Sequence, residues 1–200
     1  MQLHGHGFQA DLPRGWEGTI RREPVAEPVD ETTDAATGDG AGEATGDGAG
    51  EAADDEAAPE GRIGAAAAPA AVTAPPVMHL ATFALPGQRG DFGSGAVDLM
   101  ADEDAFVALL EYGPEEADTP LFAAQGLPRK LDPRAFSNRS LQRAMRKQSG
   151  WQHFFTEGGR AFCLYVVLGD GGDANRQVRR VEEVLAQVTI EPAAGLEGSR

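Results

Sequence analysis

Acidic residues are concentrated in one stretch of this 200-residue chain. Between Glu23 and Glu60 there are thirteen Asp and Glu residues and no Lys or Arg, so this stretch carries thirteen of the fifteen net negative charges. Residues 24–76 also contain no aromatic side chain and are rich in Ala, Gly and Pro. Such a stretch cannot bury enough apolar surface to offset the cost of ordering its backbone, about 1–2 kcal/mol per residue. We therefore predict that 24–76 is a disordered acidic insertion.

The rest of the chain is close to neutral and has the composition of a compact domain. We predict one domain formed by residues 1–23 and 77–192, with a flexible tail at 193–200. Lys supplies two of the seventeen basic residues while Ala, Gly and Arg are abundant, which is typical of GC-rich bacterial genomes.

Alternating apolar residues and turn signals predict a sheet. Phe8, Ala10 and Leu12 alternate with polar residues, and strands are expected on both sides of the turn at 13–15. Further strands are expected at 77–85, 94–100, 105–112, near 121–124, and at 189–191. The segment 105–112 could instead form a short helix, but its strict alternation favours a strand.

A β-hairpin is the clearest local motif. The Gly-Gly pair at 158–159 suits a type I′ turn, in which both central residues need positive φ. The register that follows pairs Phe155 with Phe162. The apolar run 162–168 indicates a central strand covered on both faces.

Two helices are predicted to provide that cover. Asp173 precedes a segment whose apolar residues recur at helical spacing up to Val188. The second helix is predicted from Ser137 to about Gln148. The predicted fold class is therefore α+β: a mainly antiparallel sheet flanked by two helices and interrupted by the long disordered acidic loop.

Both ends of the predicted domain resemble PsbP-like domains. The opening Phe8…Leu12-Pro13-Arg14-Gly15-Trp16 is similar to the first strand and Pro-x-Gly-Trp turn of that family, and 181–190 is similar to its closing helix and strand. The resemblance covers the chain outside the acidic insertion and assigns no binding residue. It implies an α/β/α sandwich in a superfamily of mostly non-catalytic binding and assembly proteins. We expect the chain to depart from many bacterial members in its insertion and in lacking an export or lipid signal.

Motifs that carry chemistry are scarce. The glycine-rich segment 87–93 lacks the Lys-Ser/Thr ending of a phosphate loop, and no Gly-x-Ser-x-Gly elbow occurs. His4 and His6 lack a third zinc ligand nearby, and Cys163 lies in an apolar strand that predicts an inert thiol. We expect no catalytic residue, no cofactor and no metal. The longest apolar run is too short to span a membrane, so the cytoplasm is the expected location.

The candidate binding residues lie on the second predicted helix. At 100° per residue, Arg139, Arg143, Arg146 and Lys147 fall within a sector of about 100°. The segment 129–147 has seven basic residues and one acidic residue. This face is either a solvated helix surface or an anion- or partner-binding surface. Nucleic acid is disfavoured as a partner, because no aromatic residues alternate with the charges.

The sequence favours a non-catalytic binding or assembly module that acts in the cytoplasm on another protein. Two alternatives stay open. One is an enzyme whose scattered active site forms no motif, and the other is an anion- or nucleic-acid-binding protein that uses the basic helix. The oligomeric state is not predicted.

Overall fold

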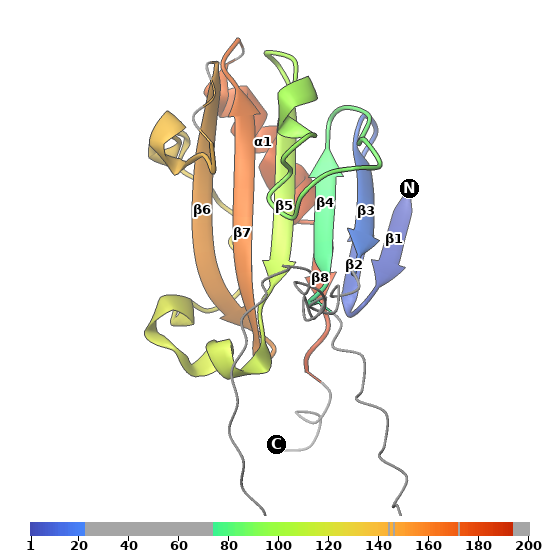
Figure 1. The fold of residues 1–200 in the computed structure, drawn as a ribbon, viewed down its shortest axis with the longest axis vertical. Coiled ribbons are helices and arrows are strands. Elements are labelled where there is room, and N and C mark those ends of the chain that lie inside the picture. The colour runs from blue at the N-terminus through green and yellow to red at the C-terminus, as the bar shows by residue number, and fades with distance from the viewer. Residues whose placement is uncertain (23–73, 144, 146, 172, 194–200) are drawn as a thin grey trace, which may run out of the picture. The chain divides into compact units, whose positions relative to one another are not determined.

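The computed structural model describes residues 1–22, 74–143, 145, 147–171 and 173–193 (Figure 1). The predicted acidic insertion, apart from 74–76, and the predicted tail, apart from Ala193, lie outside the described residues. The described residues have mixed α/β structure, with antiparallel strands and one α-helix.

Strands of the described residues form two antiparallel sheets. The large sheet has the strand order β3-β4-β5-β7-β6, and the small sheet has the order β1-β2-β8. Their bounds are β1 Gln2–Gly5, β2 Phe8–Asp11, β3 Glu17–Arg21, β4 Val77–Ala81, β5 Ala105–Glu111, β6 Gln148–Glu157, β7 Arg160–Gly169 and β8 Val188–Ile190. The predicted strands around the turn at 13–15 and the strand at 105–112 are confirmed.

One face of the large sheet, called here the helix face, packs against α1 (Ala174–Leu185) and the small sheet. Figure 1 shows α1 behind the large sheet. The helix begins after Asp173, whose side chain accepts a hydrogen bond from the Asn175 N–H at 2.9 Å. Its buried Val181 and Phe8 of the small sheet belong to the same core as Phe162 of β7. The predicted C-terminal helix is therefore confirmed.

The opposite face, called here the loop face, is covered by irregular segments. Residues 82–104 connect β4 to β5, and their Phe92 and Val97 pack against the core of this face, which includes Phe106 and Tyr165. Gly93 adopts a φ of +81°, and a Cβ there would lie 2.4 Å from the Phe106 ring. This position therefore requires glycine, because both the backbone conformation and the close approach exclude a side chain.

The hairpin register is confirmed. Phe155 pairs with Phe162, and both turn glycines have positive φ, +60° at Gly158 and +73° at Gly159. The strand β6 starts at Gln148, the residue at which the second predicted helix was expected to end. As expected, β7 is an interior strand of its sheet and is buried on both faces.

The predicted helix from Ser137 to Gln148 is wrong. The described residues of this segment contain a single 3-10 turn, Asn138–Ser140, followed by Leu141 in an extended conformation. Ser137 instead forms an antiparallel bridge with Gly150, and Gln148 pairs with Gly169. Long-range sheet pairing therefore overrides the helical spacing of the apolar residues, as tertiary contacts often override propensity.

Two predicted strands are also wrong. The segment 94–100 contains the 3-10 helix Val97–Leu99, because positive φ values at Gly93 and Gly95 turn the chain across the loop face. The segment 121–124 overlaps the 3-10 helix Pro120–Phe122. Just beyond it, Gln125 forms an isolated bridge with Thr156.

A buried arginine joins the two sheets. Arg160 is 9 % exposed and donates to both carboxylate oxygens of Glu111, at 2.8 and 2.7 Å. It also donates to the carbonyl oxygens of His6, Gly7 and Glu191. Five hydrogen bonds to one guanidinium use its full donor capacity. Arg160 thereby fixes the small sheet against the end of the hairpin.

Candidate ligand cavity on the loop face

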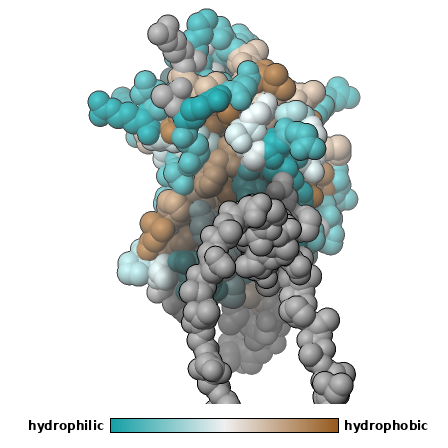
Figure 2. All heavy atoms as spheres, viewed as in Figure 1, coloured by the Kyte–Doolittle hydropathy of each residue, from teal (hydrophilic) through white to brown (hydrophobic). Residues whose placement is uncertain are grey.

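A cavity of about 410 Å³ opens on the loop face, between residues 91–97 and 141–148. Its largely apolar lining residues are Phe92, Val97, Leu141, Met145 and Tyr165. Its polar lining residues are Asp91, Ser94, Gln142, Arg143 and Gln148. Figure 2 shows hydrophobic residues in a band on this side of the molecule, with hydrophilic residues around its upper end. An apolar hollow with a few convergent polar groups is the usual form of a small-molecule site.

Tyr165 of β7 is an aromatic wall of the cavity. Side chains alternate along a strand, so Tyr165 faces the loop side while Leu164 and Val166 belong to the core of the helix face. Its ring meets Phe92 edge-on, with centroids 5.5 Å apart. The hydroxyl accepts a hydrogen bond from the Gln142 N–H at 3.2 Å, and burial raises the pKa of Tyr165. The phenol therefore stays protonated at neutral pH and keeps its own proton for another acceptor.

Gln148, the first residue of β6, is a buried polar residue of the cavity lining. The residue is 9 % exposed, and its Nε2 donates to the Val97 carbonyl oxygen at 2.6 Å. Its Oε1 is buried and has no hydrogen-bond partner among the described residues. Leaving a buried acceptor unpaired costs about 1–3 kcal/mol.

The two charged residues of the lining already form ion pairs. Asp91 lies 3.4 Å from the Arg21 guanidinium, and Arg143 pairs with Asp98. The charge of each side chain is therefore compensated by the protein itself. The cavity does not favour a ligand of either sign.

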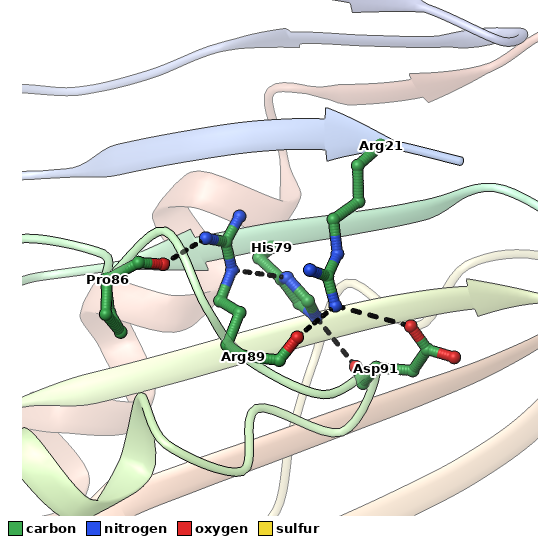
Figure 3. Close-up of polar contacts among 5 residues, drawn as sticks. All are labelled: Arg21, His79, Pro86, Arg89 and Asp91. Atoms are coloured by element: carbon green, nitrogen blue, oxygen red, sulfur yellow. Dashed lines mark hydrogen bonds and ion pairs between the residues drawn. The ribbon is translucent and has the colours of Figure 1, made fainter. Parts of the chain in front are cut away.

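His79, buried beneath residues 82–104, holds the part of the cavity wall that contains Asp91 (Figure 3). His79 of β4 is fully buried, and its Nδ1 lies 2.9 Å from Arg89 Nε. Because Arg89 Nε can only donate, Nδ1 is the acceptor, and the neutral ring carries its proton on Nε2. Nε2 then donates to the Asp91 carbonyl oxygen at 2.7 Å. Arg21 of β3 completes the network by donating to the Arg89 carbonyl oxygen.

Burial sets the protonation states of two titratable side chains on the loop face, His79 and Cys163. Desolvation lowers the pKa of His79 to about 4, and the positive charges of Arg89 and Arg21 act in the same direction. Desolvation likewise raises the pKa of Cys163 to about 11. At neutral pH the imidazole is neutral and the thiol is protonated. Neither group is poised to exchange a proton or to attack a substrate near pH 7.

Three of the four residues predicted as a basic helix face are described, and they lie in different local structures. Arg139 is exposed on the 3-10 turn, and Arg143 lines the cavity. Lys147 has a backbone φ of +63°, and its Nζ lies 3.8 Å from Oδ2 of Asp102. Arg146 lies outside the described residues. The three described residues share no helix, and one of them contributes to the cavity, so their role in anion or partner binding stays a prediction.

The histidines near the N-terminus lie apart in local structure. His4 is in β1, and its Nε2 lies 3.6 Å from Oε1 of Glu191. His6 occupies the β1–β2 turn with a φ of +52°. Within the part of the chain that the structure describes, no group of three or more His, Cys, Asp or Glu side chains could hold a metal ion.

Sequence reasoning missed the cavity, the His79 network and the role of Gln148. One signal was available for His79, because a lone histidine inside the apolar strand Val77–Ala81 has to find buried polar partners. For Gln148 there was no such signal. It was placed at the end of a helix, and its partner Val97 is 51 positions away.

Comparisons with known proteins add no family. No protein-family model matches the chain, and no match was found among curated proteins or solved structures. The resemblance to PsbP-like domains therefore stays a prediction. None of the helices among the described residues is both long and apolar enough to cross a membrane.

Proposed function

We propose that this chain is a non-catalytic binding module that holds a small, mostly apolar molecule in the loop-face cavity. The carrying observation is the cavity itself, whose 410 Å³ volume lies within the range of about 300–1,000 Å³ that is usual for ligand pockets. Its aromatic and aliphatic lining, with a few polar groups, supports the same function.

The alternatives have weaker support. Catalysis by His79 or Cys163 is disfavoured, because their pKa values of about 4 and about 11 lie far from neutral. Anion binding is weakened because Arg143 and Lys147 already pair with Asp98 and Asp102. Assembly with another protein and a location in the cytoplasm remain part of the proposal, on the basis of composition and the PsbP-like resemblance.

The test is a screen of small apolar probes by saturation-transfer NMR, followed by a cavity-filling variant. Ser94 lines the cavity and is exposed, so Ser94→Trp should block the cavity without disturbing the core. Leu99→Trp is the matched control, because Leu99 lies in the same loop and is 63 % exposed. We expect probes to bind the wild type and the control, and to bind Ser94→Trp at least about tenfold more weakly.

Two results would contradict the proposal. If no probe binds the wild type at millimolar concentration, the cavity is not a ligand site. If Ser94→Trp binds the probes as well as Leu99→Trp does, the ligand site lies elsewhere.

A further inference from the structure

We propose that the outer edge of β6 binds an extended, uncharged peptide segment of a partner protein, which pairs antiparallel with residues 151–155. These residues lie outside the cavity lining, so the inference goes beyond the ligand binding proposed above. Three features of β6 carry it: unpaired backbone groups, a run of residues without charge, and the side chains beside the edge.

The strand β6 is the outermost strand of the large sheet (Figure 1), and parts of the chain already pair with both ends of its outer edge. Gly150 exchanges two hydrogen bonds with Ser137, of 2.8 and 3.0 Å. Thr156 forms two hydrogen bonds with residues 124–126, both of 2.8 Å. Successive residues of an antiparallel strand direct their backbone N–H and C=O groups alternately to the two sides. The even-numbered residues of β6 therefore bond outward, and the odd-numbered ones bond to β7.

Gln152 and Phe154 are the outward-facing residues between these paired ends. Their outward backbone N–H and C=O groups form no hydrogen bond with any other described residue. Residues 151–154 are half-buried, so this part of the strand reaches solvent. Backbone groups seldom stay unpaired away from water, so these groups are left to water or to a partner strand. An antiparallel segment can exchange a pair of hydrogen bonds with each of the two residues.

The length of the open edge selects a short segment rather than a second copy of β6. A second ten-residue strand would extend past both ends of the gap and collide with the segments that are bonded to Gly150 and Thr156. A peptide that is extended over about five residues fits between the paired ends and can bend away beyond them.

The strand β6 lacks the residues that usually keep a sheet edge from pairing. No Lys, Arg, Asp, Glu or Pro occurs from 148 to 156, whereas β3, at the other edge of the large sheet, has Glu17 and Arg21 at its ends. Charged side chains and proline are common means of protecting an edge. The edge residues themselves offer no counter-ion to a charged peptide, so an uncharged segment loses less on leaving water.

The side chains beside the open edge favour apolar and aromatic residues in the partner. On the helix face, the rings of Trp151 and His153 are stacked, with centroids 5.5 Å apart and an angle of 8°. On the loop face, the ring of Phe154 meets Phe122 edge-on at 5.4 Å. Directly opposite side chains of paired strands lie about 4.5–5.5 Å apart and interact. The matching segment therefore has an aromatic residue opposite His153 and β-branched residues opposite Gln152 and Phe154.

The probe is the capped peptide acetyl-Thr-Val-Tyr-Val-Thr-amide, whose tyrosine is placed to lie opposite His153. Two further peptides carry N-methyl groups, one on both valines and the other on the tyrosine. In the proposed pairing the valine N–H groups point at β6 and the tyrosine N–H points away from it. Affinities for the full chain are measured by titration with NMR detection.

Two variants of Gln152 test the edge from the side of the protein. Gln152→Pro removes the outward N–H and leaves the hydrogen bonds to β7, because an edge strand accepts proline where the N–H faces solvent. Gln152→Ala is the matched control. It loses the same side chain, including the hydrogen bond of 3.2 Å from Nε2 to Cys163 Sγ, but keeps the backbone N–H.

We expect the wild type and Gln152→Ala to bind the parent peptide and the tyrosine-methylated peptide with similar affinity. The valine-methylated peptide should bind the wild type at least about tenfold more weakly, and Gln152→Pro should weaken the parent peptide by a similar factor. Ser94→Trp, which fills the cavity, should leave peptide binding unchanged, so this inference and the proposed function are tested separately.

Four results would overturn the inference. The first is no binding of the parent peptide to the wild type at millimolar concentration, and the second is a valine-methylated peptide that binds as well as the tyrosine-methylated one. The third is a dimer in analytical ultracentrifugation that Gln152→Pro dissociates, because a second copy would then occupy the edge. The fourth is peptide binding that Ser94→Trp abolishes. If Gln152→Pro does not fold, the two N-methylated peptides on the wild type still decide.

Discussion

The helix face and the loop face of the large sheet are both buried, but by different kinds of structure. On the helix face, α1 and the small sheet satisfy most of their own backbone hydrogen bonds and bring apolar side chains such as Val181 and Phe8 to the core. On the loop face, the described residues of 82–104 and 137–147 form turns and short 3-10 helices in place of long regular elements. Polar side chains of the sheet also hold them: His79 and Gln148 donate to carbonyl oxygens of 82–104, and the Tyr165 hydroxyl accepts from the Gln142 N–H.

The difference shows how one sheet can combine stability with a binding site. Regular elements pack densely and contribute to a stable core, whereas loops fastened at a few polar points leave space between them. We therefore expect the helix face to dominate the free energy of unfolding and the loop face to hold the ligand.

The largest expected effect compares one phenylalanine from each face. Phe162 is fully buried on the helix face, whereas Phe92 is half-buried on the loop face. Phe162→Ala should lower the free energy of unfolding by about 3–5 kcal/mol, and Phe92→Ala by roughly half of that or less. Urea denaturation measures both values. Equal losses would show that the loops pack as densely as the helix.

Double substitutions test whether the two faces contribute independently to the free energy of unfolding. Phe155 and Phe162 stack with centroids 5.5 Å apart, so their losses should be non-additive by about 0.5–3 kcal/mol. Phe92 belongs to the core of the opposite face, so Phe92→Ala should add to Phe162→Ala within about 0.5 kcal/mol. Strong coupling between Phe92 and Phe162 would mean that the two faces do not act independently.

The next effect is a pH dependence of the free energy of unfolding that arises from His79 on the loop face. His79 has its pKa lowered from 6.5 to about 4, so the unfolded chain binds a proton at a higher pH than the native protein does. The stability contributed by neutral His79 is complete above pH 6.5 and is lost as the pH falls toward 4, by up to about 3 kcal/mol.

His79→Gln isolates this contribution, because glutamine does not titrate and the variant keeps all carboxylates and the other histidines. The wild type should therefore lose more stability than His79→Gln between pH 6.5 and 4, as measured by denaturation at each pH. Parallel pH profiles for the two proteins would show that His79 is not held neutral by the native fold.

A smaller effect tests the conformation of the segment that forms the cavity wall. Lys147 has a φ of +63°, which glycine tolerates better than any other residue. Lys147→Gly should be more stable than Lys147→Ala by up to about 1 kcal/mol, and both variants remove the ion pair with Asp102. In a helix the order would be reversed, with glycine less stable by about 1 kcal/mol. Thermal or urea denaturation decides between the two.

The smallest expected effect concerns Cys163. The thiol is buried on β7 and its pKa is raised to about 11, so only about a thousandth is thiolate at pH 8. We expect negligible reaction with a thiol reagent in the native protein and complete reaction in urea. Rapid native labelling would show that the loop face opens frequently around this residue.

Much of the helix face could be predicted, because its elements follow from local patterns. The Gly-Gly turn fixed the register of Phe155 opposite Phe162, and Asp173 marked the start of α1. The loop face could not be predicted in the same way. Leu141 and Met145 have helical spacing, yet sheet pairing at Gln148 and Gly150 extends the chain there. Among the predicted site residues, Arg143 lines the cavity, but the described residues of 137–148 form no α-helix to present it.

By itself, the sequence determined the acidic composition of residues 24–76, the hairpin and the helix α1, because these depend on neighbours in the chain. The tertiary structure alone decided the cavity, the neutral state of His79 and the buried acceptor of Gln148. Each of these arises from groups of different chain segments that meet on the loop face, such as the Gln148 side-chain amide and the Val97 carbonyl oxygen, 51 positions apart. Desolvation and hydrogen bonding at such contacts depend on the packing of the whole domain, which no local sequence pattern encodes.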